Sequence, residues 1–138
     1  MQIKIYPLNK FRRLKEFSKV FKITDDTVIA YDSAIYCNKQ LHDDVLVHER
    51  VHLAQQKQHG LKTFTDKYLT DKKFRLEMEI AAYKAQLASI EDKGLREAVR
   101  KDSINGIISG LYGKITKEQA EQMLPAETET KLNVNKLI

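Results

Sequence analysis

Residues 43–60 read DDVLVHERVHLAQQKQHG, and this stretch carries the signals that begin and end an α-helix. Asp43 or Asp44 offers an N-cap, because a short acidic side chain accepts hydrogen bonds from the first free backbone N–H groups. Gly60 favours termination, since glycine readily adopts the left-handed conformation that follows many helices. A helix is therefore predicted from the aspartates to about Gln58.

The predicted helix carries the string HERVH at positions 48–52, whose residue types are those of a zinc-hydrolase site. Side chains four residues apart lie on the same face of a helix, so His48 and His52 are placed to bind one metal ion. Glu49 follows the first histidine, where it lies beside the metal and can take a proton from a bound water. A catalytic zinc has three protein ligands and one water, so a third ligand is needed.

A second helix is expected to supply that ligand from either Glu77 or Glu79. This helix is predicted from about residue 70 to residue 94, with an apolar stripe formed by Leu76, Ile80, Tyr83, Leu87 and Ile90. At 100° per residue, Glu79 lies roughly 60° from the centre of the stripe and Glu77 roughly 100° from it. The helical phase favours Glu79 and leaves Glu77 as the alternative.

Two other histidines are weaker candidates for the metal site. The backbone of His59 would lie roughly 10 Å beyond that of His52 along an unbroken helix. His42 precedes the expected start of the helix, so we expect it on the surface or lining a cleft, where it could stabilise an oxyanion.

The remaining segments predict an α+β fold with a small N-terminal β-sheet or hairpin. Residues 2–6 alternate apolar and polar side chains, as a strand does. Asn9 could cap a helix with Phe11, Leu14, Phe17 and Phe21 on one side. Residues 27–31 and 34–37 favour β-structure and predict a hairpin, whose edge could pair with an extended peptide.

Short helices are expected in the C-terminal part of the chain. Residues 95–108 have a helical pattern, and the glycines that follow predict a loop. Thr116 and Gln119 predict a capping box for a last helix that Pro125 ends. The tail, residues 126–138, has no clear period and is expected to be disordered or to add a strand.

The composition favours one soluble globular domain, which we place at residues 1–125. The 138 residues are 42% hydrophobic and 31% charged. The apolar runs are too short to span a membrane and the N-terminus lacks the apolar core of a signal peptide, so we expect no membrane insertion and a cytoplasmic location. Cys37 is the only cysteine, which excludes an internal disulfide.

The net charge of +5 does not by itself indicate a nucleic-acid partner. Basic residues concentrate in residues 10–22 and 62–75, with acidic residues among the second group. No helix-turn-helix, zinc-finger or aromatic basic-strand signature accompanies them. We interpret the excess lysine as solvated helix faces, and keep a nucleic-acid-associated protein with an accidental HERVH string as a weaker alternative.

The string HERVHLAQQ at 48–56, followed by EIAAY at 79–83, resembles the gluzincin metallopeptidases. The resemblance is closest to their very small members, the minigluzincins, and to related small zinc peptidases of phages and bacteria. It is strongest over residues 43–86. It implies a minimal zincin-like fold in which His48, His52 and Glu79 bind Zn²⁺ and Glu49 is the general base. The leading hypothesis is therefore a zinc peptidase, an endopeptidase rather than an exopeptidase, with a peptide or protein as substrate.

The chain departs from the larger gluzincins at one position. Those proteins often carry an acidic residue four positions after the glutamate ligand, where it orients a zinc histidine, whereas this chain has Tyr83. Tyr83 either hydrogen-bonds in the cleft or belongs to the core, and the partners of the two histidines are unassigned. The alternative function is a zinc-stabilised, non-catalytic structural or host-interaction module, as a phage protein could be, in which Glu49 is dispensable.

Overall fold

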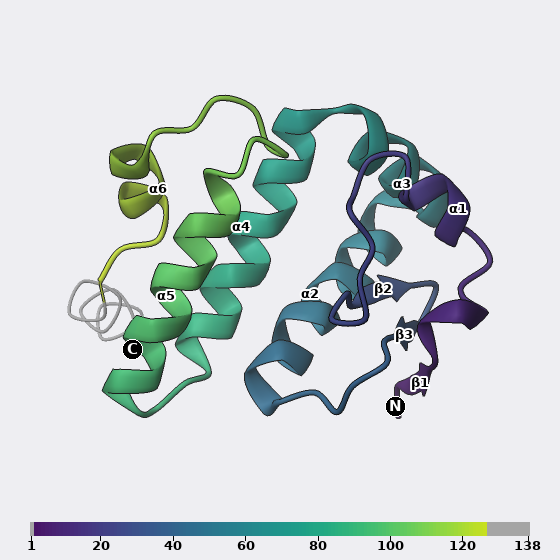
Figure 1. Cartoon of the computed structure of the whole chain (residues 1–138), viewed down its shortest axis with the longest axis horizontal. Coiled ribbons are helices and arrows are strands. Elements are labelled where there is room, and N and C mark those ends of the chain that lie inside the picture. Colours follow the sequence, from purple (N-terminus) through teal and green to yellow (C-terminus); the bar gives the residue numbers. More distant parts are fainter. Residues whose placement is uncertain (1, 127–138) are drawn as a thin grey trace.

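The computed structural model describes residues 2–126 and has an α+β architecture, with a three-stranded sheet and six α-helices within that range (Figure 1). In chain order the elements are β1 (Lys4–Tyr6), the 3₁₀ turn η1 (Leu8–Lys10), α1 (Leu14–Phe17), β2 (Ile29–Tyr31), β3 (Ala34–Tyr36), α2 (Asp43–His59), α3 (Leu61–Thr70), α4 (Lys72–Ala88), α5 (Lys93–Ile107) and α6 (Lys117–Met123). The expected α+β class is confirmed. Apart from Ala126, the expected C-terminal tail lies outside the described residues.

The sheet has the order β1-β3-β2, with β3 in the centre. β2 and β3 form the predicted antiparallel hairpin, and β1 pairs with β3 in parallel. The turn between β2 and β3 places Asp32 at φ 49° and Ser33 at φ 68°. Positive φ at both central residues is the geometry that lets a two-residue turn match the twist of its strands. β2 is left as an edge strand.

The predicted N-terminal helix after Asn9 is wrong. Asn9 lies within η1, and only Leu14–Phe17 forms an α-helix in this part of the chain. The aromatic residues instead pack on one another and on the hairpin, with ring centroids 5.0 Å apart for Phe11 and Phe17 and 5.2 Å apart for Phe11 and Tyr31. The apolar spacing therefore reflects packing against the sheet and not a continuous helix.

The boundaries of α2 agree with the sequence except at its first residue. The N-cap is His42, and both Asp43 and Asp44 lie in the first turn, so the predicted aspartate cap is wrong. Acidic residues in the first turn still favour the helix, because they interact with the positive end of its dipole. Gly60 ends α2 at φ 86°, as predicted.

The second half of the chain contains two differences from the expected helices. α3 was not predicted, and it fills the interval between Gly60 and Asp71. α4 ends at Ala88, so the predicted extension to residue 94 is wrong. Asp92 caps a separate helix, α5, by accepting a hydrogen bond from the Leu95 N–H at 2.8 Å. The capping box predicted for the last helix is confirmed.

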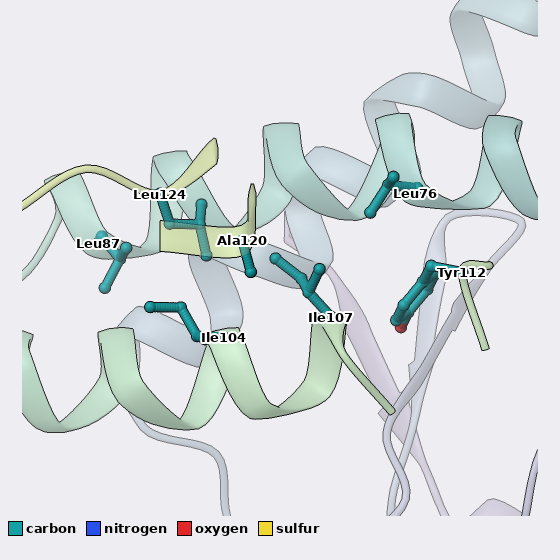
Figure 2. Close-up of a cluster of buried hydrophobic side chains, with 7 residues drawn as sticks. All are labelled: Leu76, Leu87, Ile104, Ile107, Tyr112, Ala120 and Leu124. Carbon is teal, nitrogen blue, oxygen red and sulfur yellow. The ribbon is translucent and has the colours of Figure 1, made fainter. Parts of the chain in front are cut away.

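Two layers of packing hold α2 and α4 in place. α2 lies between the sheet and α4 (Figure 1), and Ala30, Ile35, Cys37 and Leu53 form the apolar cluster between the sheet and α2. α5 and α6 cover the other side of α4 through a cluster of Leu76, Leu87, Ile104, Ile107, Tyr112, Ala120 and Leu124 (Figure 2). The interface between α2 and α4 is therefore supported from both sides.

None of the helices within residues 2–126 is both long enough and apolar enough to cross a membrane.

Two isoleucines in register on the neighbouring strands β1 and β3 test this arrangement. Ile35 on β3 is fully buried, whereas its register partner Ile5 on β1 is 51% exposed. We expect Ile35→Ala to lower the free energy of unfolding by about 2–5 kcal/mol, because it removes buried apolar atoms and leaves a cavity. Ile5→Ala, the matched control, should change it by less than about 1 kcal/mol. Urea denaturation monitored by circular dichroism measures both, and equal losses would contradict the packing described.

Candidate metal centre

α2 and α4 bring the side chains of His48, His52 and Glu79 together in the interior of the protein. The Nε2 atoms of the two histidines are 3.1 Å apart. One Glu79 oxygen lies 3.1 Å from His48 Nε2, and the other lies 2.8 Å from His52 Nε2. All three residues are buried, with 5–7% of their surface exposed. They form the group within the described residues that could hold a metal ion.

The three side chains fit a tetrahedral zinc ion. Zinc binds imidazole nitrogen and carboxylate oxygen at about 2.0–2.1 Å, which places neighbouring ligand atoms about 3.3 Å apart. The observed separations of 2.8–3.1 Å are slightly shorter than this value. Small side-chain movements would therefore be enough to place one ion among them. The donor set alone does not distinguish zinc from other divalent transition metals that bind histidine and carboxylate.

The other candidate ligands lie elsewhere. Glu77 is exposed on α4, as the helical phase predicted, whereas Glu79 is buried. His59 packs its ring against Phe74 at the end of α2, with centroids 5.4 Å apart. His42 lines a different hollow, beside Asp43. The structure thus brings together the three predicted ligands and separates them from these alternatives.

Two glutamines contact the outer nitrogens of the histidines. The Nδ1 atom of His48 lies 2.8 Å from Gln86 Oε1, and that of His52 lies 2.9 Å from Gln55 Oε1. The Gln86 amide NH₂ donates to the Asp44 carboxylate at 2.8 Å, which fixes the direction of that amide. Both glutamine oxygens therefore accept hydrogen bonds from Nδ1–H groups.

These contacts select the tautomer that metal binding requires. A neutral imidazole with its proton on Nδ1 has its lone pair on Nε2, and both Nε2 atoms point to the centre. Sequence reasoning missed this role of Gln55 and Gln86. The available signal was helical spacing, since Gln55 is one turn after His52 and Gln86 is roughly two turns after Glu79.

Tyrosines complete the surroundings of the centre. Tyr68, on the unpredicted helix α3, donates a hydrogen bond to Glu79 Oε2 at 2.5 Å. Burial and the nearby Glu79 carboxylate raise the pKa of Tyr68 well above its ordinary value, so its hydroxyl stays a donor. Tyr83 packs the edge of its ring against His48, with centroids 4.7 Å apart. Its hydroxyl faces α5, where a Cβ atom on Gly106 would lie 3.1 Å away. Tyr83 therefore orients His48 by packing.

The charges of the centre balance one another. Burial disfavours a charged His52, but the Glu79 carboxylate outweighs this effect and raises the pKa of His52 to about 9. Burial also disfavours a charged Glu79, yet the charge on a protonated His52 and the close approach of both histidine rings lower the pKa of Glu79 well below its usual range. A proton on His52 thus places a positive charge beside Glu79, and a divalent cation bound among the three ligand atoms would take the place of that proton as the positive charge.

Glu49 lies beside the three ligands. Its Oε2 atom is 4.0 Å from His48 Nε2, farther than the Glu79 oxygen. The residue is 7% exposed, and the structure gives its carboxylate no hydrogen-bond donor among residues 2–126. Burial raises the pKa of Glu49 above its ordinary value, and the two histidines oppose the shift only in part. A buried carboxylate without a donor is uncommon, and such groups occur often at functional sites.

The centre opens into a cavity of about 230 Å³. Glu49, His48, His52 and Glu79 line one part of it, and side chains of β2 and α3 line other parts. Glu49 is therefore placed where a molecule in this cavity would lie next to both the carboxylate and the metal ligands.

Removing the carboxylate ligand tests the composition of the centre. We expect Glu79→Ala to weaken Zn²⁺ binding more than about 100-fold, because one of three ligands is lost. Glu77→Ala on the same helix is the matched control and should leave the affinity unchanged. Competition with a chromogenic chelator measures both affinities, and a larger effect of Glu77→Ala would contradict the site.

The glutamine contacts make a separate prediction. Gln86→Leu removes the acceptor for His48 Nδ1–H, so the imidazole is no longer held in one tautomer and orientation. We expect a loss of zinc affinity of about 10–100-fold. Gln58→Leu, on the exposed face of α2, provides the control. Isothermal titration calorimetry measures the affinities, and NMR of the ring nitrogens reports the tautomer. An unchanged Nδ1–H population in Gln86→Leu would rule out the proposed orientation.

No protein-family model, curated protein sequence or solved structure matches this chain. The candidate metal centre is therefore supported by the positions of its own residues.

Proposed function

We propose that this protein is a zinc-dependent metallopeptidase with a zincin-like fold. His48, His52 and Glu79 bind the ion, and Glu49 is the general base. The observation that carries the proposal is the buried Glu49 carboxylate, which has no donor among residues 2–126 and lies 4.0 Å from His48 Nε2. A group that bridges to the reacting atoms through one water needs such a position.

Different residues of the chain have different roles in the proposed hydrolysis. Bound zinc supplies Lewis acidity, which lowers the pKa of a water toward neutrality and polarises a carbonyl group. Glu49 accepts the proton of the attacking water and passes it to the nitrogen of the leaving amine. Its raised pKa suits this role, because a carboxyl group that titrates closer to neutral pH can both take and release a proton. Gln55 and Gln86 keep the two imidazole rings in one tautomer and orientation during the reaction.

The edge strand β2 is suited to hold an extended peptide. Its residues line the cavity beside Glu49, and its outer edge is not paired with another strand within residues 2–126. Gln56 already occupies one end of that edge, where its amide bonds the Ala30 carbonyl at 2.8 Å and the Asp32 N–H at 2.9 Å. A substrate would therefore pair with the N-terminal half of β2 by β-augmentation.

The charges around the cavity favour an internal peptide bond as the substrate. Among the described residues that line it there is no lysine or arginine to bind a terminal carboxylate. The carboxylates in this part of the chain that line it are Glu49 and Glu79, and both already have roles, so neither is left to bind a terminal amine. An endopeptidase fits these constraints better than an exopeptidase does.

A zinc-stabilised, non-catalytic module is the second candidate, because the metal centre joins the two longest helices, α2 and α4. Structural zinc sites usually have four protein ligands, whereas three are present among the described residues. A structural role also gives no reason to bury Glu49 beside the centre. Both features favour the peptidase.

Glu49→Gln separates the two candidates. We expect about one zinc per chain in both the native protein and the variant, with cleavage of a peptide library lowered at least about 100-fold in the variant, because the amide cannot accept the proton. Glu77→Gln, which neutralises an exposed acid on α4, should keep full activity. Mass spectrometry of the products and metal analysis give the two readouts. Equal cleavage by the native protein and Glu49→Gln would exclude the proposed base.

A further inference from the structure

The cavity beside the metal centre is lined mainly by apolar side chains. The aromatic residues among them are Phe17, Phe21, Tyr31, Phe64, Tyr68 and Tyr112. Ile23, Val28 and Ile29 add aliphatic surface from the segment that leads into β2. Glu49 and Glu79 are the only acidic groups in the lining, and both belong to the site already described.

The size of the cavity suits one side chain. A cavity of about 150 Å³ lined by apolar residues can bind benzene, whereas drug-sized ligands usually occupy about 300–1,000 Å³. The value here is about 230 Å³. It is large enough for a phenyl ring or a leucine side chain and too small for a large organic molecule.

The aromatic wall of the cavity is held in place by stacked contacts. Phe64 stacks on Tyr68 with ring centroids 5.4 Å apart, and the Phe21 ring is tilted against Tyr68 with centroids 5.7 Å apart. The buried guanidinium of Arg75 lies 5.1 Å from the Phe21 ring and 5.8 Å from the Tyr68 ring. Arg75 also donates to the backbone carbonyls of Tyr68 and Leu69 at 2.7 and 3.0 Å. The wall is therefore a fixed surface.

Tyr68 connects this wall to the metal centre. Its ring belongs to the aromatic wall, and its hydroxyl donates to Glu79 at 2.5 Å. A side chain lying against the wall would thus have its backbone close to Glu49 and the metal ligands. A peptide residue whose side chain entered the cavity would therefore be expected to flank the bond that Glu49 and the metal ligands face.

We propose that this cavity selects a large apolar side chain, such as phenylalanine, leucine or methionine, of a peptide bound along β2. The inference rests on the proposed peptidase function and names its substrate class. An acidic side chain would lose its hydration in the cavity without gaining a cationic partner, because no lysine or arginine is among the described residues that line it. A basic side chain would meet only Glu49 and Glu79, the carboxylates assigned to the base and to the metal. A small side chain would leave the apolar wall without contacts.

Peptide binding to the zinc-loaded Glu49→Gln variant tests the selection without requiring cleavage. The probes are capped tetrapeptides, acetyl-Ala-Ala-X-Ala-amide, with Phe, Leu, Ala, Asp or Lys at X, and NMR titration measures their dissociation constants. We expect the Phe and Leu peptides to bind roughly 10–100-fold more tightly than the other three, as burial of one large apolar side chain provides. Equal affinity for all five peptides would overturn the proposal.

A matched pair of variants locates the preference in the cavity. Ile23 lines the cavity, whereas Ile5 is exposed on β1 and does not. In the Glu49→Gln background, Ile23→Lys should weaken binding of the Phe peptide at least about tenfold and favour the Asp peptide, while Ile5→Lys should change neither. Val28→Lys repeats the test from a neighbouring position in the lining. A loss equal to that of Ile5→Lys in both cavity variants would contradict the assignment.

Cleavage by the native protein distinguishes this proposal from the proposed function. Cleavage of a randomised peptide library beside Phe, Leu or Met supports both. Cleavage without any preference for apolar residues contradicts the cavity assignment and still supports the proposed peptidase function. An apolar preference in binding with no cleavage of any peptide supports the cavity assignment and contradicts the peptidase.

Discussion

The structure depends on burying two histidines and a carboxylate between α2 and α4. Groups of this kind are costly to remove from water unless each is paired and hydrogen-bonded. His48, His52 and Glu79 meet that condition through one another, two glutamines and a tyrosine. This network fixes how the two helices face each other. The apolar clusters on either side then keep the helices at that distance.

Glu49 is the exception to this pattern. It is as buried as the histidines, yet the described part of the chain gives its carboxylate no hydrogen-bond donor. The other three polar side chains of the centre have hydrogen-bond partners. Burying the Glu49 carboxylate without a donor therefore lowers the stability of the folded protein. The cost is understandable if the carboxylate exchanges a proton with a bound molecule. The adjoining cavity gives such a molecule a place to lie, with an aromatic wall that shares Tyr68 with the centre.

Several signals that act over one or two turns of backbone were read correctly, although the residue that caps α2 was not. The hairpin, the end of α2 at Gly60 and the capping box of α6 follow from the preferences of the residues that form them. The segment after Asn9 was misread because its aromatic residues are spaced for packing on the sheet, and a similar spacing occurs in helices. α4 was made too long because the break at residues 89–92 depends on the Asp92 cap of α5 more than on composition. α3 was missed, although the start of the next helix near residue 70 was predicted.

The sequence by itself determined that His48 and His52 share one face of a helix, and the helical phase favoured Glu79 over Glu77 as their partner. It could not determine what surrounds them. Gln86 reaches His48 across 38 positions of sequence, and Tyr68 comes from a helix that composition did not reveal. The aromatic cavity likewise joins α1, β2 and α3, which are distant in the chain. Only tertiary packing decides such contacts, since side chains far apart in sequence carry no local signal of their neighbours.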